Sequence, residues 1–276
     1  MCVTCGCSDD NAKITYPHAV AVESHSHEHY HTHTLPDGTA IAHSHSHDTV
    51  NNASLHAKVH NTTISLEQDI LAKNDLIAAQ NRGWFKGRNI LALNLMSSPG
   101  SGKTTLLTRT INDLKNKLTI SVIEGDQETI NDAKKIEATG CKVVQINTGT
   151  GCHLDASMVE KGLQKLNPEL NSVVAIENVG NLVCPALFDL GEQAKVTILS
   201  VTEGEDKPIK YPHIFRASNV MVITKIDLLP YVQFDVEKCI EYARQVNPNI
   251  QIFQVSAITA QGLDDWYRWL QMGINN

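Results

Sequence analysis

A glycine-rich turn joins a predicted strand to a predicted helix, and its residues are of the types that bind phosphate. The strand covers residues 90–96 and is mostly apolar. The turn and the first helical residues are Ser97, Ser98, Pro99, Gly100, Ser101, Gly102, Lys103, Thr104 and Thr105. Glycines let successive N–H groups point into one concavity, and the helix N-terminus adds a positive dipole end. This order of strand, loop and helix predicts a site for a nucleoside triphosphate.

Within this loop, Lys103 is expected to contact the β- and γ-phosphates, and the Thr104 hydroxyl is expected to bind Mg²⁺. The alternative is an ordinary βα turn with an exposed lysine. Ser97 occupies the position at which the strict phosphate-loop pattern has glycine. The Gly-Lys-Thr-Thr sequence after an apolar strand keeps most of the specificity, so we favour nucleotide binding.

Two further predicted strands end in carboxylates that suit a magnesium site. Asp126 comes shortly after the second strand of the series, and Glu177 ends the fourth. A carboxylate at the carboxyl end of a parallel strand can bind Mg²⁺, directly or through water, or orient the attacking water. Asp126 would equally suit the N-cap of the next helix. With Lys103, these two are the expected catalytic residues, and Gly180 is expected to offer its N–H to the γ-phosphate.

A candidate element for base recognition ends the sixth predicted strand. Thr224, Lys225 and Asp227 stand where guanine-binding proteins have an Asn/Thr-Lys-x-Asp sequence. The carboxylate accepts hydrogen bonds from N1–H and the 2-amino group of guanine, which adenine cannot donate, so the element selects GTP over ATP. Ser256 and Ala257, after the seventh strand, fit the loop that supports the base. Threonine in place of the usual asparagine is expected to brace the surrounding loops less.

Three further side chains are of metal-binding type. Cys152 and His153 follow a predicted strand, and Cys184 lies downstream of Glu177 and Gly180. Three ligands are few for a closed structural site, but a symmetric dimer sharing the ion would supply the rest. The alternatives are a buried apolar cysteine and a hydrogen-bonded histidine. From the residues alone, both interpretations stay open.

The N-terminal segment is rich in soft and borderline metal ligands. Cys2, Cys5 and Cys7 lie close enough to chelate one ion such as Ni²⁺ or Zn²⁺. Two runs of alternating histidines follow: His25, His27, His29, His31 and His33, then His43, His45 and His47. Alternation also suits a strand, but the intervening residues offer no apolar face, so we expect residues 1–62 to be disordered, without a packed core, and to store metal. A polar linker or a cloning tag are the alternatives.

Composition limits the function classes. The chain has 276 residues, 42% of them hydrophobic, and a formal charge of −7. The negative charge argues against nucleic acid as a partner, because such binding needs a basic face. We see no apolar run of membrane-spanning length and no signal-peptide pattern, and therefore expect no membrane association and a cytoplasmic location. Seven cysteines in that compartment favour thiols or metal ligands over disulfides.

Strands and helices alternate through the rest of the chain. A capping-box sequence at residues 65–68 predicts a helix that ends near residue 83. Predicted strands are 90–96, 119–123, 142–147, 172–177, 195–200, 219–223 and 250–254, and predicted helices are 103–115, 129–138, 155–166, 235–246 and 262–271. This α/β alternation predicts a mostly parallel sheet flanked by helices over residues 63–276, a P-loop domain preceded by the tail of residues 1–62.

The combined motifs resemble the HypB-type GTPases, which incorporate nickel during maturation of NiFe hydrogenases. The resemblance covers about residues 65–276 and rests on the sequences at 97–105, 124–126, 152–156, 177–185 and 224–230, together with the Cys- and His-rich tail. The related urease accessory GTPases have Cys-Pro-His where this chain has Cys152-His153. The phosphate-loop sequence with Ser97 is the family's own.

The resemblance implies a fold of the SIMIBI class of P-loop GTPases, slow GTP hydrolysis and a homodimer favoured by GTP. It further implies a nickel or zinc site at the dimer interface from Cys152, His153 and Cys184, and a separate nickel site at Cys2, Cys5 and Cys7. Implied partners are a HypA-type metallochaperone and the hydrogenase large subunit. A metal-storage protein with a regulatory GTPase domain is the alternative function.

Overall fold

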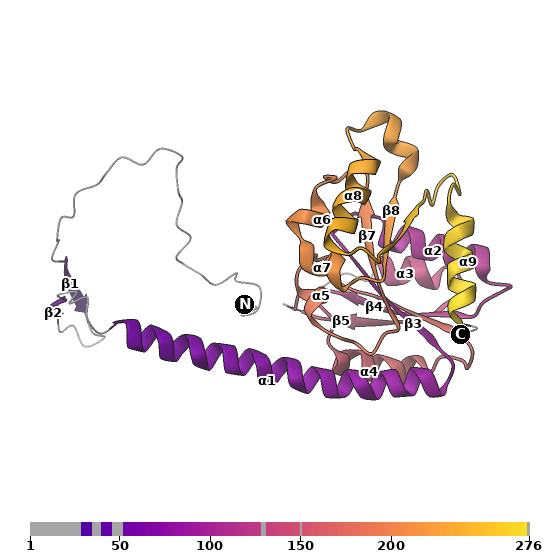
Figure 1. Ribbon diagram of the computed structural model, residues 1–276. Coiled ribbons are helices and arrows are strands. Elements are labelled where there is room, and N and C mark those ends of the chain that lie inside the picture. The colour runs from indigo at the N-terminus through magenta and orange to yellow at the C-terminus, as the bar shows by residue number, and fades with distance from the viewer. Residues whose placement is uncertain (1–28, 35–39, 46–51, 128–130, 150, 275–276) are drawn as a thin grey trace. The chain divides into compact units, whose positions relative to one another are not determined.

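The computed structural model describes residues 29–34, 40–45, 52–127, 131–149 and 151–274. Its main unit begins at Asp69 and contains seven parallel strands in the order β5-β4-β6-β3-β7-β8-β9 (Figure 1). The strands are β3 (Leu91–Ser97), β4 (Ile120–Asp126), β5 (Lys142–Asn147), β6 (Val173–Glu177), β7 (Ala194–Ser200), β8 (Val220–Thr224) and β9 (Gln251–Gln254). The prediction of a mostly parallel sheet is confirmed, with every predicted strand present within a few residues.

Helices cover both faces of this sheet. They are α1 (Asn52–Gly87), α2 (Lys103–Leu114), α3 (Asn131–Glu137), α4 (Ala156–Leu166), α5 (Cys184–Leu187), α6 (Lys207–Lys210), α7 (Pro212–Ala217), α8 (Val236–Val246) and α9 (Leu263–Ile274). Apolar side chains of α2, α3 and α9 pack on one face, whereas those of α1, α4, α7 and α8 pack on the other. β3 is buried along its whole length, because it lies in the middle of the sheet with helices on both sides.

The side chains of β3 alternate between the two faces of the sheet. Leu91, Leu93 and Leu95 pack in the cluster that includes α2, whereas Ala92 and Met96 pack on the opposite side. Asn94 shares the second face, because side chains two residues apart in a strand point the same way. It is fully buried and is therefore a polar exception in an apolar strand.

Helix α1 begins at Asn52, earlier than the capping-box sequence at residues 65–68 suggested. The preceding stretch includes Ala, Leu and Lys, which favour helix, alongside Asn, Thr and His, which favour it less. The expected boundary between residues 62 and 63 therefore falls inside a helix. The chain divides near Gln68, and the unit that ends there includes the first part of α1.

Part of the histidine-rich segment forms an antiparallel hairpin. Strand β1 (His29–Thr34) pairs with β2 (Ala40–His45), with His29 opposite His45 and His31 opposite His43. A strand here was the alternative to the expected disorder, and the period-two pattern with β-branched residues favours it. A two-stranded hairpin does not by itself supply a packed core. Cys2, Cys5, Cys7, His25, His27 and His47 lie outside the described residues.

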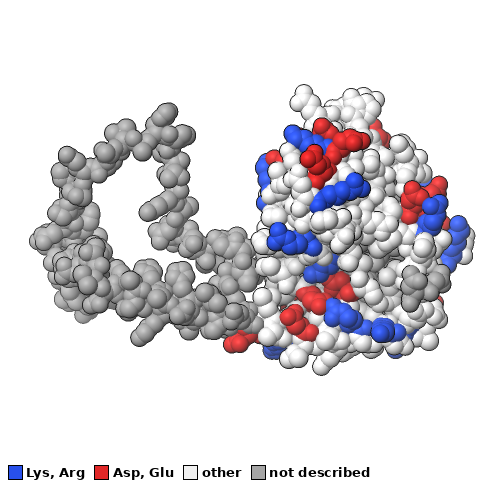
Figure 2. Space-filling model, viewed as in Figure 1, with Lys and Arg blue, Asp and Glu red and all other residues white. Residues whose placement is uncertain are grey.

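Two surface properties accompany this fold. Lys and Arg side chains alternate with Asp and Glu side chains on the visible face of the domain, and the basic ones form no continuous patch there (Figure 2). No helix in the described part of the chain combines the length and the apolarity that a membrane crossing requires.

Candidate nucleotide and metal sites

The glycine-rich loop after β3 has the backbone that its sequence predicts. Gly100 and Gly102 have φ values of 76° and 94°, a left-handed conformation that glycine adopts without strain. The Lys103 ammonium donates to the Ser97 hydroxyl at 3.0 Å, across the mouth of the loop. Ser97, which occupies the position of the first glycine in the strict pattern, thus provides an acceptor that positions the Lys103 side chain.

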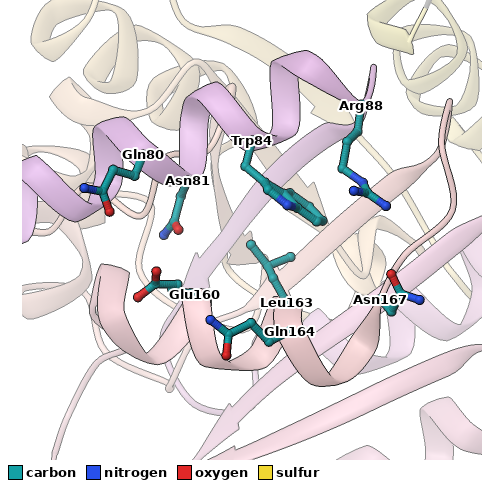
Figure 3. A pocket seen from close by; sticks show the side chains of 8 residues that line it. All are labelled: Gln80, Asn81, Trp84, Arg88, Glu160, Leu163, Gln164 and Asn167. Atoms are coloured by element: carbon teal, nitrogen blue, oxygen red, sulfur yellow. The ribbon is translucent and has the colours of Figure 1, made fainter.

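A cavity of ≈ 470 Å³ opens over this loop, within the range of ligand-binding clefts. It brings together the predicted phosphate-contacting residues from the loop, Asp126, Gly180 and Lys225. Asp132 and Lys135 of α3 line it as well, and these two form an ion pair at 2.7 Å. A different cavity of ≈ 320 Å³ lies between α1 and α4 and includes Trp84 and Arg88 (Figure 3). None of the residues singled out by sequence lines that second cavity.

The Thr104 hydroxyl donates to Glu177 Oε1 at 2.6 Å, which joins the loop to the end of β6. Glu177 is 3% exposed, and its second oxygen has no hydrogen-bond partner among the described residues. Burial raises the pKa of Glu177, while Lys103 and the Thr104 hydroxyl oppose the shift. An unpartnered carboxylate oxygen beside a threonine hydroxyl suits a hard divalent cation such as Mg²⁺.

Glu124 is a second buried carboxylate, and no role was predicted for it from the sequence. It lies opposite Glu177 in the β4–β6 register, and its Oε2 also has no partner among the described residues. Burial, followed by the charge of Glu177, raises the pKa of Glu124 to about 8. An acidic residue inside an apolar strand, two positions before Asp126, is the signal that could have identified it.

Asp126 ends β4 and borders the cavity, as a ligand of Mg²⁺ or of its water would. One of its oxygens accepts from the Gln127 N–H at 2.7 Å. Asp126 is the last residue of β4 and Gln127 after it is not helical, so Asp126 does not occupy the N-cap position of a helix. The capping alternative is therefore wrong for this residue.

The predicted base-recognition element packs against the phosphate loop. The Thr224 hydroxyl donates to the Ser101 carbonyl at 2.6 Å, and the Lys225 ammonium donates to the Gly100 carbonyl at 2.8 Å. Threonine at this position therefore braces the loop directly. Asp227 Oδ1 is buried and has no hydrogen-bond partner among the described residues, so the hydrogen-bonding capacity of this acceptor is unfilled.

The loop expected to support the base is held by its own contacts. The Ser256 hydroxyl accepts from the Thr259 N–H at 3.1 Å, and the Ala257 carbonyl accepts from Arg109 at 3.0 Å. With Asp227, these residues lie beyond the lining of the phosphate cavity. The structure therefore brings the phosphate-contacting set together with Lys225, whereas Asp227, Ser256 and Ala257 do not line that cavity.

The ligand atoms of Cys152, His153 and Cys184 lie within 4.8 Å of one another. The thiol of Cys152 is 3.6 Å from His153 Nδ1, and Cys184 is buried at the start of α5. The His153 ring stacks on Phe188 at 4.0 Å, a contact for which the sequence gives no signal. Burial lowers the pKa of His153, which favours the neutral imidazole that metals bind. Thiolates and a neutral imidazole suit nickel or zinc.

The fold and the phosphate loop define a P-loop nucleotide-binding protein. Residues 91–254 match the family model described as CobW/HypB/UreG, nucleotide-binding domain. The hydrogenase maturation factor HypB of Escherichia coli K12 is 47% identical over 98% of both chains. The HypB protein of Rhizobium leguminosarum bv. viciae is 57% identical over 76% of this chain and 70% of its own.

A crystal structure of Helicobacter pylori HypB in complex with nickel superimposes with a TM-score of 0.69. It is 36% identical and covers 74% of this chain and 95% of its own. The chain therefore belongs to the HypB hydrogenase maturation factors within the CobW/HypB/UreG family.

Proposed function

We propose that this chain is a GTP-hydrolysing nickel metallochaperone that delivers Ni²⁺ during maturation of NiFe hydrogenase. One observation carries the proposal: a single short segment, residues 177–184, contributes to both sites. At one end Glu177 accepts the Thr104 hydroxyl, and at the other Cys184 joins Cys152 and His153. A change in the bound phosphates at Glu177 can therefore reach the metal ligand Cys184 through the backbone of one short segment.

GTP is the proposed nucleotide because Asp227 offers a buried acceptor oxygen without a partner among the described residues. Lys103 would bind the phosphates together with the loop amides, and the Gly180 N–H would meet the γ-phosphate. Thr104, Glu177 and Asp126 would hold Mg²⁺, which neutralises phosphate charge when bound. Hydrolysis to GDP and phosphate is proposed to be slow in the isolated protein.

Nickel is the proposed cargo of the cysteine–histidine cluster, and zinc is the alternative ion. Support comes from the donor set and from the nickel complex of the H. pylori relative. Val183 and Leu187, on either side of buried Cys184, are 38% and 39% exposed. Exposed apolar side chains beside an incomplete ligand set favour a second copy of the chain, which would complete the coordination. We therefore propose a homodimer favoured by GTP.

The proposed partners are a HypA-type metallochaperone and the hydrogenase large subunit, met in the cytoplasm. Membership of the hydrogenase maturation factors supports this assignment. Cys2, Cys5 and Cys7 would bind nickel tightly, and the histidine runs would store it. A storage protein with a regulatory GTPase domain is the rival. Removal of residues 1–51 leaves α1 whole, and this deletion should abolish function at ample nickel only if storage is the function.

Light scattering tests the delivery proposal most directly. The full chain is measured with GDP and with a non-hydrolysable GTP analogue, each with and without saturating Ni²⁺. A dimer favoured by the analogue and altered by nickel is expected. The control, Cys184→Ala, should keep the response to nucleotide and lose the response to nickel. A monomer in every condition would contradict the proposal.

A further inference from the structure

A buried asparagine links the surroundings of the two sites. Asn178 directly follows Glu177 and is 1% exposed. Its Oδ1 accepts from two backbone groups, the N–H of Leu154 and the N–H of Val179, each at 3.0 Å. Its side-chain amide donates to Asn94 Oδ1 at 3.2 Å. One side chain thereby joins its own segment to two others.

Each of those segments leads to a functional group. Leu154 is the residue after His153 in the metal cluster. Val179 precedes Gly180, and both residues line the phosphate cavity. Asn94 lies in β3, three residues before Ser97 and the phosphate loop.

The hydrogen-bonded chain continues beyond Asn94 and returns to the metal cluster. The Asn94 amide donates to Glu192 Oε1 at 3.2 Å, and Glu192 Oε2 accepts from the Leu190 N–H at 2.7 Å. Phe188, two residues earlier in the chain, stacks on His153. The chain of contacts thus approaches His153 from Leu154 on one side and from Phe188 on the other.

We propose that Asn178 is the positioning residue through which the state of the phosphates changes the geometry of the metal cluster. This inference rests on the proposed function. Its oxygen holds the Leu154 and Val179 N–H groups together, so a movement of Val179 and Gly180 must carry the Leu154 backbone with it or break a buried hydrogen bond. Breaking it leaves a buried donor without a partner, which is costly. If the Leu154 backbone follows the movement instead, His153 shifts relative to Cys184.

The coupling has to be reciprocal. If a bound nucleotide changes the affinity for metal by some factor, bound metal must change the affinity for that nucleotide by the same factor. Couplings between sites are typically about 5- to 150-fold in affinity. We expect a factor on the order of tenfold here. Asn178 touches neither ligand, so its removal should reduce that factor more than it changes either affinity measured alone.

The test measures GDP and GTP-analogue affinities of the full chain with and without saturating Ni²⁺. Cys184→Ala keeps the tail, so it gives the nickel effect that does not come from the cluster. The nickel effect on nucleotide affinity in Asn178→Ala is expected to lie within about twofold of that in Cys184→Ala. The effect in Asn94→Ala is expected to lie between those of Cys184→Ala and the parent. Asn94→Ala keeps the proposal testable if Asn178→Ala does not fold.

Asn247→Ala is the matched structural control. The Asn247 amide donates to the carbonyls of Phe215 and Ser218, and none of these residues lines the phosphate cavity or belongs to the metal cluster. It should lower the melting temperature and leave the coupling intact. If Asn178→Ala and Asn94→Ala behave in the same way, the role of Asn178 is only structural and the inference is overturned.

A measurement without metal separates the two proposals further. Amide hydrogen exchange at Leu154 should differ between the GDP and GTP-analogue states of the parent, and this difference should disappear in Asn178→Ala. Equal exchange at Leu154 in both states of the parent would overturn the inference. A parent without any nickel effect on nucleotide affinity would overturn the proposed function as well, whereas a nickel effect insensitive to Asn178 would overturn the inference alone.

Discussion

Gly180→Ala should weaken binding of the triphosphate, because Gly180 lies against the phosphate loop. A Cβ at this position would lie 3.0 Å from Pro99 Cγ and 3.1 Å from both Pro99 Cα and Pro99 N. The neighbour is a rigid ring and the loop backbone itself, so it can yield only if the loop moves. Overpacking of this kind costs about 1–3 kcal/mol. That cost corresponds to a loss of roughly 5- to 150-fold in affinity.

The assay is titration of a fluorescent GTP analogue and of GDP, with phosphate release measured at saturating GTP. The loss should be larger for the analogue than for GDP, since the Gly180 N–H is proposed to meet the γ-phosphate. Gly83→Ala is the control, because a Cβ there meets nothing within 4 Å and the residue lies in helix α1. The Gly83→Ala variant should bind both nucleotides with the affinity of the parent. Unchanged analogue affinity in Gly180→Ala would refute the close-approach argument.

Three shorter predictions follow from single contacts. Asp227→Asn should reverse the base preference from guanine to xanthine by at least about a hundredfold, since a site that pairs with polar groups rejects the mismatched analogue strongly; competition binding with both triphosphates checks this. Thr104→Val removes the hydroxyl that Glu177 accepts, so GTP turnover should fall about tenfold or more and respond less to Mg²⁺ in a titration. Gly262 has a φ of 73°, and a Cβ there would overlap the Gln254 carbonyl, so Gly262→Ala should lower the unfolding free energy by ~2 kcal/mol or more in thermal melts.

The sheet and the phosphate loop were predictable because both depend on local sequence. A parallel strand that is buried on both faces is a nearly continuous apolar run, and the predicted strands at 90–96 and 172–177 match β3 and β6 within one residue. The loop at residues 97–105 is recognised by glycines and lysine at fixed spacing. Because parallel strands end at the same edge of the sheet, Asp126 and Glu177 could be placed there as well.

Features that depend on tertiary contacts could not be predicted in this way. The helices α5, α6 and α7 have four to six residues, too few for a periodic pattern. Glu124 and Asn178 acquire their roles from neighbours on other strands and loops, as in the pairing of Glu124 with Glu177. The stacking of Phe188 on His153 joins residues that no motif relates.

The geometry of the metal cluster suggests how small a movement the proposed function needs. Two thiolates on one tetrahedral ion with bonds of about 2.3 Å lie about 3.8 Å apart. The three ligand atoms lie within 4.8 Å of one another, and Cys152 Sγ and His153 Nδ1 are already 3.6 Å apart. The remaining adjustment concerns Cys184 and is at most about 1 Å.

A shift of that size matters because metal coordination tolerates deviations of only about 0.2 Å. Cys184 is seven positions after Glu177, in a segment whose Gly180 lies against Pro99 of the phosphate loop. If the loop moves by a fraction of an ångström and the shift accumulates along that segment, Cys184 moves far enough to gain or lose its bond to the ion. The proposed delivery of nickel therefore requires no large rearrangement of the domain, only a movement of residues 177–184 relative to the Cys152–His153 pair.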